Sequence, residues 1–174
     1  GGQAQTLTRL TVTGRLNDAD ITTLKNMPQL ASLDLYDALL PGNKLKDEAF
    51  NGKTSLTSIK LPVSLEEIGA SAFNDCANIA GELKLPVTLK KIGENAFCNA
   101  AKLDGILTIP AAVSQIGDAA FKKCGFTGLV FKGTLITELG VEVFRECADM
   151  TGLLTIPSSV TTIGTGCFSF TGFT

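Results

Sequence analysis

Hydrophobic and polar positions follow a fixed period along most of the chain. A six-residue segment recurs in which an apolar residue and a glycine precede two variable residues, a usually small residue and a phenylalanine, as in 92–97. Further copies occupy 68–73, 116–121, 139–144 and 163–168, and 45–50 is a copy with Lys46 in place of the glycine. The repeat phenylalanines, spaced by 23 or 24 residues, are Phe50, Phe73, Phe97, Phe121, Phe144 and Phe168. A period of this length indicates an array of stacked structural units.

A second, shorter pattern lies between these segments, in which apolar and polar residues alternate. It occupies 56–61, 83–85, 107–109, 129–131 and 154–156, and a proline follows most copies. Alternation predicts a half-buried strand, and proline ends a strand because it cannot donate to the ladder. Residues 7–12 and 30–35 share the leucine spacing, so we count seven strands, and 170–174 resembles an eighth that is cut short.

One repeat cannot bury both its strand and its tight coil, so the copies are expected to stack into a solenoid. Parallel strands about 4.8 Å apart would then form a ribbon roughly 34 Å long. The repeat phenylalanine is expected to fill the space between strand and coil, and the small residue before it lets neighbouring coils approach. The repeat glycine is expected at a positive-φ or a crowded backbone position.

The segment 17–28 departs from the repeat and predicts a short helix at about 18–27. Asn17 is a capping residue, acidic residues follow it, and Pro28 ends the segment. We expect one domain over 1–174, with N-terminal capping turns in 1–44 and repeats of 23–24 residues in 45–174, the last of them truncated. The turn at 129–144 lacks the proline, so a local irregularity is expected there.

Composition excludes several functional classes. Lys and Arg total 15 against 17 Asp and Glu, which gives a net charge of -2 and no basic field for nucleic acid. The chain has no histidine, which removes histidine-dependent catalysis and histidine-ligated zinc, so we expect no enzyme, no cofactor and no metal. No apolar run approaches the ~20 residues of a membrane span.

The five cysteines are an odd number and form no C-x-x-C pair. Cys76, Cys124 and Cys147 each follow a repeat phenylalanine by three residues, whereas Cys98 and Cys167 are adjacent to one. We favour small buried fillers at a coil turn. A disulfide between neighbouring turns, such as Cys124 with Cys147, is the alternative.

Other polar motifs do not predict a site. Gly52, Lys53 and Thr54 imitate the end of a phosphate-binding loop, but Asp47 stands where that loop needs a glycine. Adjacent acids such as Glu66 and Glu67 indicate a solvated face. Asp18 and Asp20 are better explained by the helix start than by a calcium site.

The whole pattern resembles a known family. Residues 56–76 and 107–124 combine the leucine spacing with Leu-Pro or Ile-Pro, Ile-Gly-x-x-Ala-Phe and a closing cysteine, and they resemble the BspA-like leucine-rich repeats (LRR_5 type) of bacterial cell-surface proteins. The resemblance implies a leucine-rich-repeat solenoid with short parallel strands in one curved sheet, tight coils or short 3-10 or α turns on the other side, and one N-terminal helix. It also implies an extracellular or surface-anchored protein that binds proteins, with its signal or lipid anchor missing from this chain.

Function is expected at the positions that the repeat leaves free. The third and fifth residues of each strand point away from the core. Along the chain, the first half of these positions carries charged and polar residues. The second half carries apolar residues and threonines, which form a plausible exposed patch. The candidate binding residues are Lys60, Lys84, Ile106, Thr108, Val130, Leu153 and Thr155. An uncommitted sheet face is the alternative, because valine and threonine are also good strand residues.

The sequence therefore predicts a non-enzymatic surface module that recognises a protein of a host or neighbouring cell. The apolar trio would be the centre of the contact, and Lys60 and Lys84 would steer acidic groups. One rival is a structural or self-associating spacer that pairs through the segment from Phe170 to Thr174. A carbohydrate-binding module is weaker, because Tyr36 is the only aromatic residue other than phenylalanine.

Overall fold

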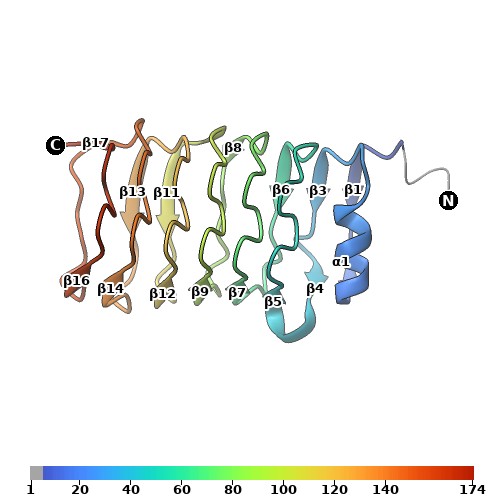
Figure 1. Cartoon of the computed structure of the whole chain (residues 1–174). Helices are drawn as coiled ribbons and strands as arrows, with labels where there is room; N and C mark the ends of the chain where they lie inside the picture. The colour runs from blue at the N-terminus through green and yellow to red at the C-terminus, as the bar shows by residue number, and fades with distance from the viewer. Residues whose placement is uncertain (1–5) are drawn as a thin grey trace.

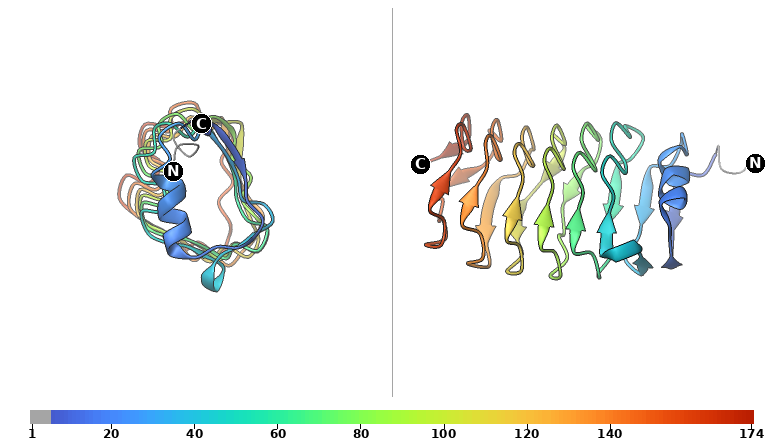
Figure 2. Two further views of the ribbon diagram at one scale, coloured as in Figure 1. Left: turned by 90° about the vertical axis from the view of Figure 1, so that its right-hand side faces the viewer. Right: turned by 60° about the horizontal axis from the view of Figure 1, so that its bottom comes forward.

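Successive repeats stack side by side along one axis, from helix α1 at one end to β17 at the other (Figure 1). Residues 6–174 of this computed structural model are described here; residues 1–5, which belong to the predicted N-terminal cap, lie outside the described part. Seen along the axis, the turns superpose into one outline (Figure 2). The solenoid predicted from the period is confirmed.

A first row of parallel strands runs along one side of the solenoid. Within this row, three successive strands form one ladder, and the other six form three separate two-stranded ladders. The strands are β1 (Arg9–Thr11), β3 (Ser32–Asp34), β6 (Ser58–Lys60), β8 (Gly81–Glu82), β10 (Leu103–Asp104), β11 (Ile106–Ile109), β13 (Gly128–Phe131), β15 (Thr151–Gly152) and β17 (Gly172–Phe173). Residues 83–85 and 154–156, which the alternation predicted as strands, join no ladder.

A change of register accompanies one interruption of the first row. Between β8 and β10, Leu103 pairs with Gly81, which is 103 − 81 = 22 residues earlier instead of 24. Gly81, at the start of β8, has a φ of +84°, a backbone conformation that favours glycine. The row therefore consists of four separate ladders that follow one another along the axis.

A second row of strands, each two residues long, precedes the coils. It comprises β2 (Gly14–Arg15), β4 (Ala38–Leu39), β5 (Lys44–Leu45), β7 (Glu67–Ile68), β9 (Lys91–Ile92), β12 (Gln115–Ile116), β14 (Glu138–Leu139) and β16 (Thr162–Ile163). The repeat pattern predicted only coils on this side of the turn, because one polar and one apolar residue are too short an alternation to recognise. The longest ladder joins β5, β7, β9 and β12, and β14 pairs only with β16. The break lies beside the turn that the sequence marked as irregular.

The coils are bound to one another by backbone hydrogen bonds. The amide of Phe73 donates to the carbonyl of Ala96 at 2.8 Å, and that of Phe97 donates to Ala120 at 2.8 Å, so each coil donates to the next turn. Between these bonds, amides such as that of Ala96 donate to a carbonyl three residues earlier in the same coil. The tight coils that the repeat predicted are therefore ordered by contacts within and between turns.

The six repeat phenylalanines form a continuous stack in the core. The ring centroids of Phe73 and Phe97 are 5.1 Å apart, and those of Phe97 and Phe121 are 5.6 Å apart. Five of the six side chains are fully buried, and Phe168 at the C-terminal end is partly buried. The predicted role of the repeat phenylalanine is confirmed.

Crowding explains the repeat glycine. A Cβ on Gly93 would stand 2.5 Å from the amide nitrogen of Ala70 in the preceding turn, closer than atoms approach. The φ of Gly93 is not positive, so of the two expected reasons only the close approach applies here.

Helix α1 (Asp18–Lys25) occupies the coil position of the first turn, slightly shorter than predicted. The Asn17 side chain accepts from the amides of Ala19 and Asp20, and the Asp20 carboxylate accepts from the amide of Asn17. Asp20 thus serves the helix start, as expected. Ile21 and Leu24 bury the inner face. A single 3-10 turn, η2 (Pro41–Asn43), follows β4.

Lys53, from the motif that imitated a phosphate loop, holds the end of this helix. Its ammonium donates to the carbonyls of Lys25 at 2.9 Å and Met27 at 2.6 Å, and its side chain is buried. Burial lowers the pKa of Lys53. The carbonyls at a helix end lack partners within the helix, so Lys53 supplies the donor that they need.

Candidate binding surfaces

The predicted binding residues lie on the outer side of the first strand row. Ile106 is 55% exposed, Val130 36% and Leu153 85%, whereas Leu107 and Leu129 beside them in sequence are buried. Lys60, Lys84 and Thr155 are also exposed, and Thr108 is half-buried. The alternation therefore predicted correctly which side chains the core leaves free.

The structure brings only some of these residues together. In the ladder of β11 and β13, Thr108 lies beside Val130 and Ile106 lies beside Gly128. Within residues 6–174, Leu153 and Thr155 belong to a segment that joins no ladder, and Lys60 lies in β6, which pairs only with β3. The paired centre of the candidate surface is therefore Ile106, Thr108 and Val130.

The two lysines already have acidic partners. The Lys60 ammonium lies 2.7 Å from the Asp34 carboxylate in the neighbouring strand, and its hydrogen bond lowers the pKa of Asp34. Lys84 lies 3.6 Å from Glu82. Much of the steering charge expected from the sequence is therefore balanced within the sheet. This ion pair could have been predicted from the sequence, since Asp34 and Lys60 hold the same position in their repeats.

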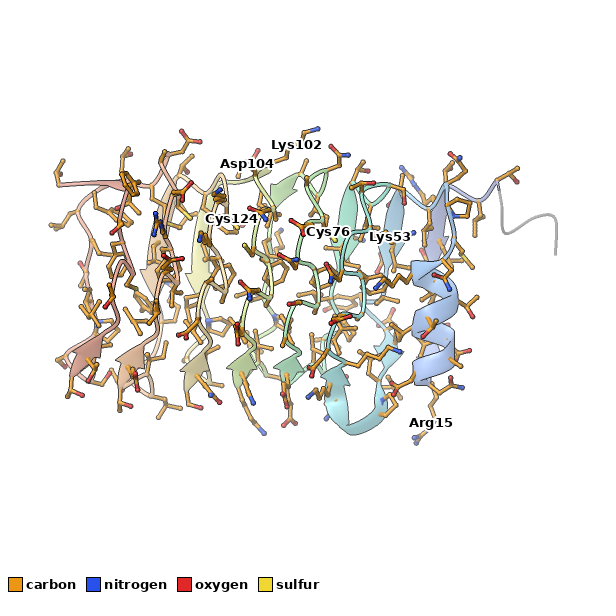
Figure 3. The ribbon with its side chains drawn as sticks, viewed as in Figure 1. Arg15, Lys53, Cys76, Lys102, Asp104 and Cys124 are labelled. Atoms are coloured by element: carbon orange, nitrogen blue, oxygen red, sulfur yellow. The ribbon has the colours of Figure 1, made fainter. Side chains whose placement is uncertain are left out.

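All five cysteines are free and buried. The thiols of Cys76, Cys124 and Cys147 donate to the carbonyls of Phe50, Phe97 and Phe121 in the preceding turns, at 3.0, 3.2 and 3.0 Å. Lys53, Cys76 and Cys124 follow one line along the axis (Figure 3). These cysteines fill the core as favoured from the sequence, and the disulfide between Cys124 and Cys147 is not formed.

A groove along the second strand row was not predicted. It has a volume of about 550 Å³ and runs across several turns, over the backbone of Gly93, Gly117 and Gly140. Its walls come from the first residue of each short strand and from the residue after each glycine. Many of these positions are polar, which is the signal in the sequence that could have indicated an open face.

The two ends of this groove differ in charge. Near β5 to β9, Glu67 lies 3.1 Å from the Lys44 ammonium and 3.5 Å from that of Lys91. The hydrogen bond to Glu67 raises the pKa of Lys44. Farther along, Glu94, Asp118 and Glu138 line the groove, and within residues 6–174 none of them has a cation within 4.0 Å. One end is balanced and the other is acidic.

The described residues contain neither a metal-binding cluster nor a membrane-spanning helix. Among residues 6–174, no group of three or more histidine, cysteine or acidic side chains is arranged to hold a metal ion. No helix in the same part of the chain is long and apolar enough to cross a bilayer.

Comparison with known families and structures gives a consistent result. The family described as "BspA type Leucine rich repeat region" matches residues 43–174 in six copies. A leucine-rich repeat protein of T. pallidum superposes with a TM-score of 0.76 at 24% identity, over 94% of this chain and 76% of that one. No curated protein sequence matches the chain.

Two longer bacterial proteins share the fold. A leucine-rich cell surface protein of Faecalibacterium prausnitzii has a TM-score of 0.69 at 22% identity, over 94% of this chain and 45% of that one. A leucine-rich repeat protein of Bacteroides ovatus has a TM-score of 0.69 at 22% identity, over 93% and 45%. The present chain spans less than half of each.

Proposed function

Because the chain belongs to the BspA-type leucine-rich repeat family, we propose that it is a non-enzymatic recognition module that binds a protein through the outer side of its first strand row. The partner is a protein of a host or a neighbouring cell. The contact is centred on Ile106, Thr108 and Val130, and Leu153 and Thr155 extend it.

One observation carries this proposal: Ile106 and Val130 are exposed apolar side chains on two strands that pair directly. Leu107 and Leu129, with opposite orientation, already provide the core contacts of these strands. The solenoid therefore does not need Ile106 and Val130 for packing. Clustered exposed apolar residues are typical of interaction sites, although single ones are common on any surface.

The absence of a side chain at Gly128 supports the same location. Gly128 has no side chain, and the Ile106 side chain lies 3.5 Å from the point where a Cβ of Gly128 would stand. A partner side chain can therefore pack against Ile106 above the backbone of β13. The sheet is already folded, so binding orders few groups and loses little conformational entropy. Lys60 and Lys84 lie at the rim, where their ion pairs limit them to a minor role.

The test is surface plasmon resonance against purified extracellular-matrix proteins, with a glycan array in parallel. We expect one or more of the matrix proteins to bind. Val130→Asp should weaken that binding by roughly tenfold or more, because it buries a charge at the centre of the contact. Reversing the charge of Lys60 and Lys84 should change it by only a few fold.

Val63→Asp is the matched control, because Val63 is similarly exposed and lies in the turn after β6. Equal loss in Val63→Asp and Val130→Asp would place the contact elsewhere. Binding to glycans but to no protein would favour the carbohydrate-binding alternative, for which Tyr36, 52% exposed, is the one aromatic residue other than phenylalanine.

A surface location is part of this proposal. The support is the family and the fold shared with a protein described as a leucine-rich cell surface protein. Immunolabelling of intact cells with an antibody to this domain would test it, and labelling only after permeabilisation would contradict it.

Self-association is the second candidate function. Ile163 in β16 is 49% exposed, whereas its equivalent in β12, Ile116, is 4% exposed. Phe170 is 70% exposed. If these side chains pair two molecules, light scattering will show a dimer that is lost when 170–174 are removed. A monomer at all concentrations would exclude a spacer that associates through this end.

A further inference from the structure

The second strand row is interrupted at one step, between β12 and β14. At other steps the amide of the repeat glycine donates to the preceding turn: Gly93 to Ile68 at 2.8 Å, and Gly117 to Ile92 at 2.9 Å. Gly140 should donate to Ile116 in the same way, yet within residues 6–174 its amide has no such bond. The carbonyl of Ile116 is left without this donor.

One end of the groove described above lies at this interruption. Residues 114–118 form one side of it there, and Thr137, Glu138 and Gly140 form the other. Its volume of about 550 Å³ falls within the range of ligand pockets, and its lining is mainly polar. The backbone hydrogen bond that joins neighbouring turns at other steps of this row is therefore absent beside the groove.

The acidic end of the groove lies at the same place. The Asp118 carboxylate uses one oxygen to accept from the amide of Val141 at 2.8 Å. Glu94 accepts only from the side-chain amide of Asn95, at 3.2 Å, and Glu138 has no hydrogen-bond partner within residues 6–174. Lys44 and Lys91 are held by Glu67 at the other end. The groove thus offers acceptors that its own cations do not occupy.

We propose that this groove binds a cationic peptide segment of a partner protein, seating an arginine or lysine side chain among Glu94, Asp118 and Glu138. The cation pairs with the carboxylates, and its remaining N–H groups reach the carbonyl of Ile116. Guanidinium suits the site best, because it carries five donors in a planar fork and no acceptor. The surface is distinct from the first strand row, so it adds a second contact to the module.

Charge complementarity identifies this occupant. An apolar peptide would leave the carboxylates and the Ile116 carbonyl without partners, and an acidic one would be repelled. A metal ion is disfavoured, because residues 6–174 contain no group of three or more histidine, cysteine or acidic side chains that could hold one. The groove is open to solvent, so the attraction is screened by salt.

The test measures fluorescence anisotropy of a labelled octapeptide of alternating glycine and arginine, with a second peptide in which citrulline replaces arginine. We expect saturable binding of the arginine peptide at low ionic strength, weakened tenfold or more in 0.5 M salt. The neutral citrulline peptide should not bind. The double variant Glu94→Gln/Glu138→Gln should bind the arginine peptide at least tenfold more weakly, with its thermal unfolding midpoint unchanged.

The matched control is Glu82→Gln/Asp104→Asn, which removes two exposed carboxylates from the first strand row and changes the net charge equally. It should retain affinity within about twofold, as should Val130→Asp. Gln115→Lys, which adds a charge to the groove and removes no carboxylate, should also weaken binding. Absence of binding, or equal loss in groove and control variants, would overturn the proposal.

Discussion

At the scale of single residues, the phenylalanine stack carries the stability of the solenoid. Phe97 is fully buried between the rings of Phe73 and Phe121. Phe97→Ala removes both contacts and leaves a cavity that the stacked turns cannot close, so we expect a loss of ~3–5 kcal/mol in the free energy of unfolding. A urea titration measures it. Phe170→Ala, at an exposed ring, should cost far less. Equal midpoints for Phe97→Ala and the intact protein would refute stacking.

The buried thiols give a second prediction at this scale. Burial raises the pKa of Cys76, Cys147 and Cys167 to about 11, and it also raises those of Cys98 and Cys124. Only the thiolate reacts with Ellman's reagent. The native protein should therefore react slowly at pH 8, and the denatured protein should show all five thiols. A lower count after denaturation would reveal a disulfide.

The same pKa shifts make stability depend on pH. An unfolded thiol loses its proton near pH ~8.5, whereas the folded chain retains it until about pH 11 at Cys76, Cys147 and Cys167. Deprotonation therefore favours the unfolded chain between these values. The urea midpoint should be higher at pH 7 than at pH 10, and replacing Cys76 by alanine should reduce the difference.

At the scale of elements, two backbone positions of the coil are expected to respond to substitution in opposite ways. Gly93 allows no Cβ, because the backbone of Ala70 lies in the way. Ala119 has a φ of +53°, where a side chain is strained. Gly93→Ala should destabilise the protein by about 1–3 kcal/mol. Ala119→Gly should stabilise it by about 0.5–1 kcal/mol, since relief of strain exceeds the entropy that glycine loses.

Both variants can be compared in one series of urea titrations. The opposite signs are the informative result, because a general sensitivity of the coil to mutation would lower both midpoints. Loss of stability in Ala119→Gly would show that its left-handed conformation carries no strain.

The elements also show what the sequence could predict and what it could not. The coils were predicted because Ile92, Gly93 and Phe97 belong to a pattern with several copies. The strands of the second row were missed, because Lys91 and Ile92 alternate only once. The role of Lys53 could not be predicted, since its acceptors belong to Lys25 and Met27, 28 and 26 residues away.

For the candidate site, the alternation was sufficient to predict which side chains face solvent. It could not predict that Leu153 lies outside the ladder of Ile106 and Val130, because the register depends on the turn at each repeat. The groove was missed because it spans several turns and one end lies at the break between β12 and β14, and a break in pairing has no sequence period.

At the scale of the whole molecule, the coil bonds have one direction. Each coil donates to the turn after it, as Phe121 donates to Val143 and Phe144 donates to Cys167. The backbone amides of helix α1 form hydrogen bonds within the helix, so they need no acceptor in the next turn. The helix can therefore precede the first coil. The two surfaces proposed to bind partners, the outer face of the first row and the groove of the second, both lie on the sides of the stack.

Hydrogen exchange at the amides of the repeat phenylalanines tests the stacked structure most directly. Phe73, Phe97, Phe121 and Phe144 donate to the next turn, whereas the amide of Phe168 has no acceptor within residues 6–174. We predict that the first four exchange only through global unfolding, and that Phe168 exchanges orders of magnitude faster. Equally fast exchange at Phe97 and Phe168 would contradict a solenoid held together by bonds between its turns.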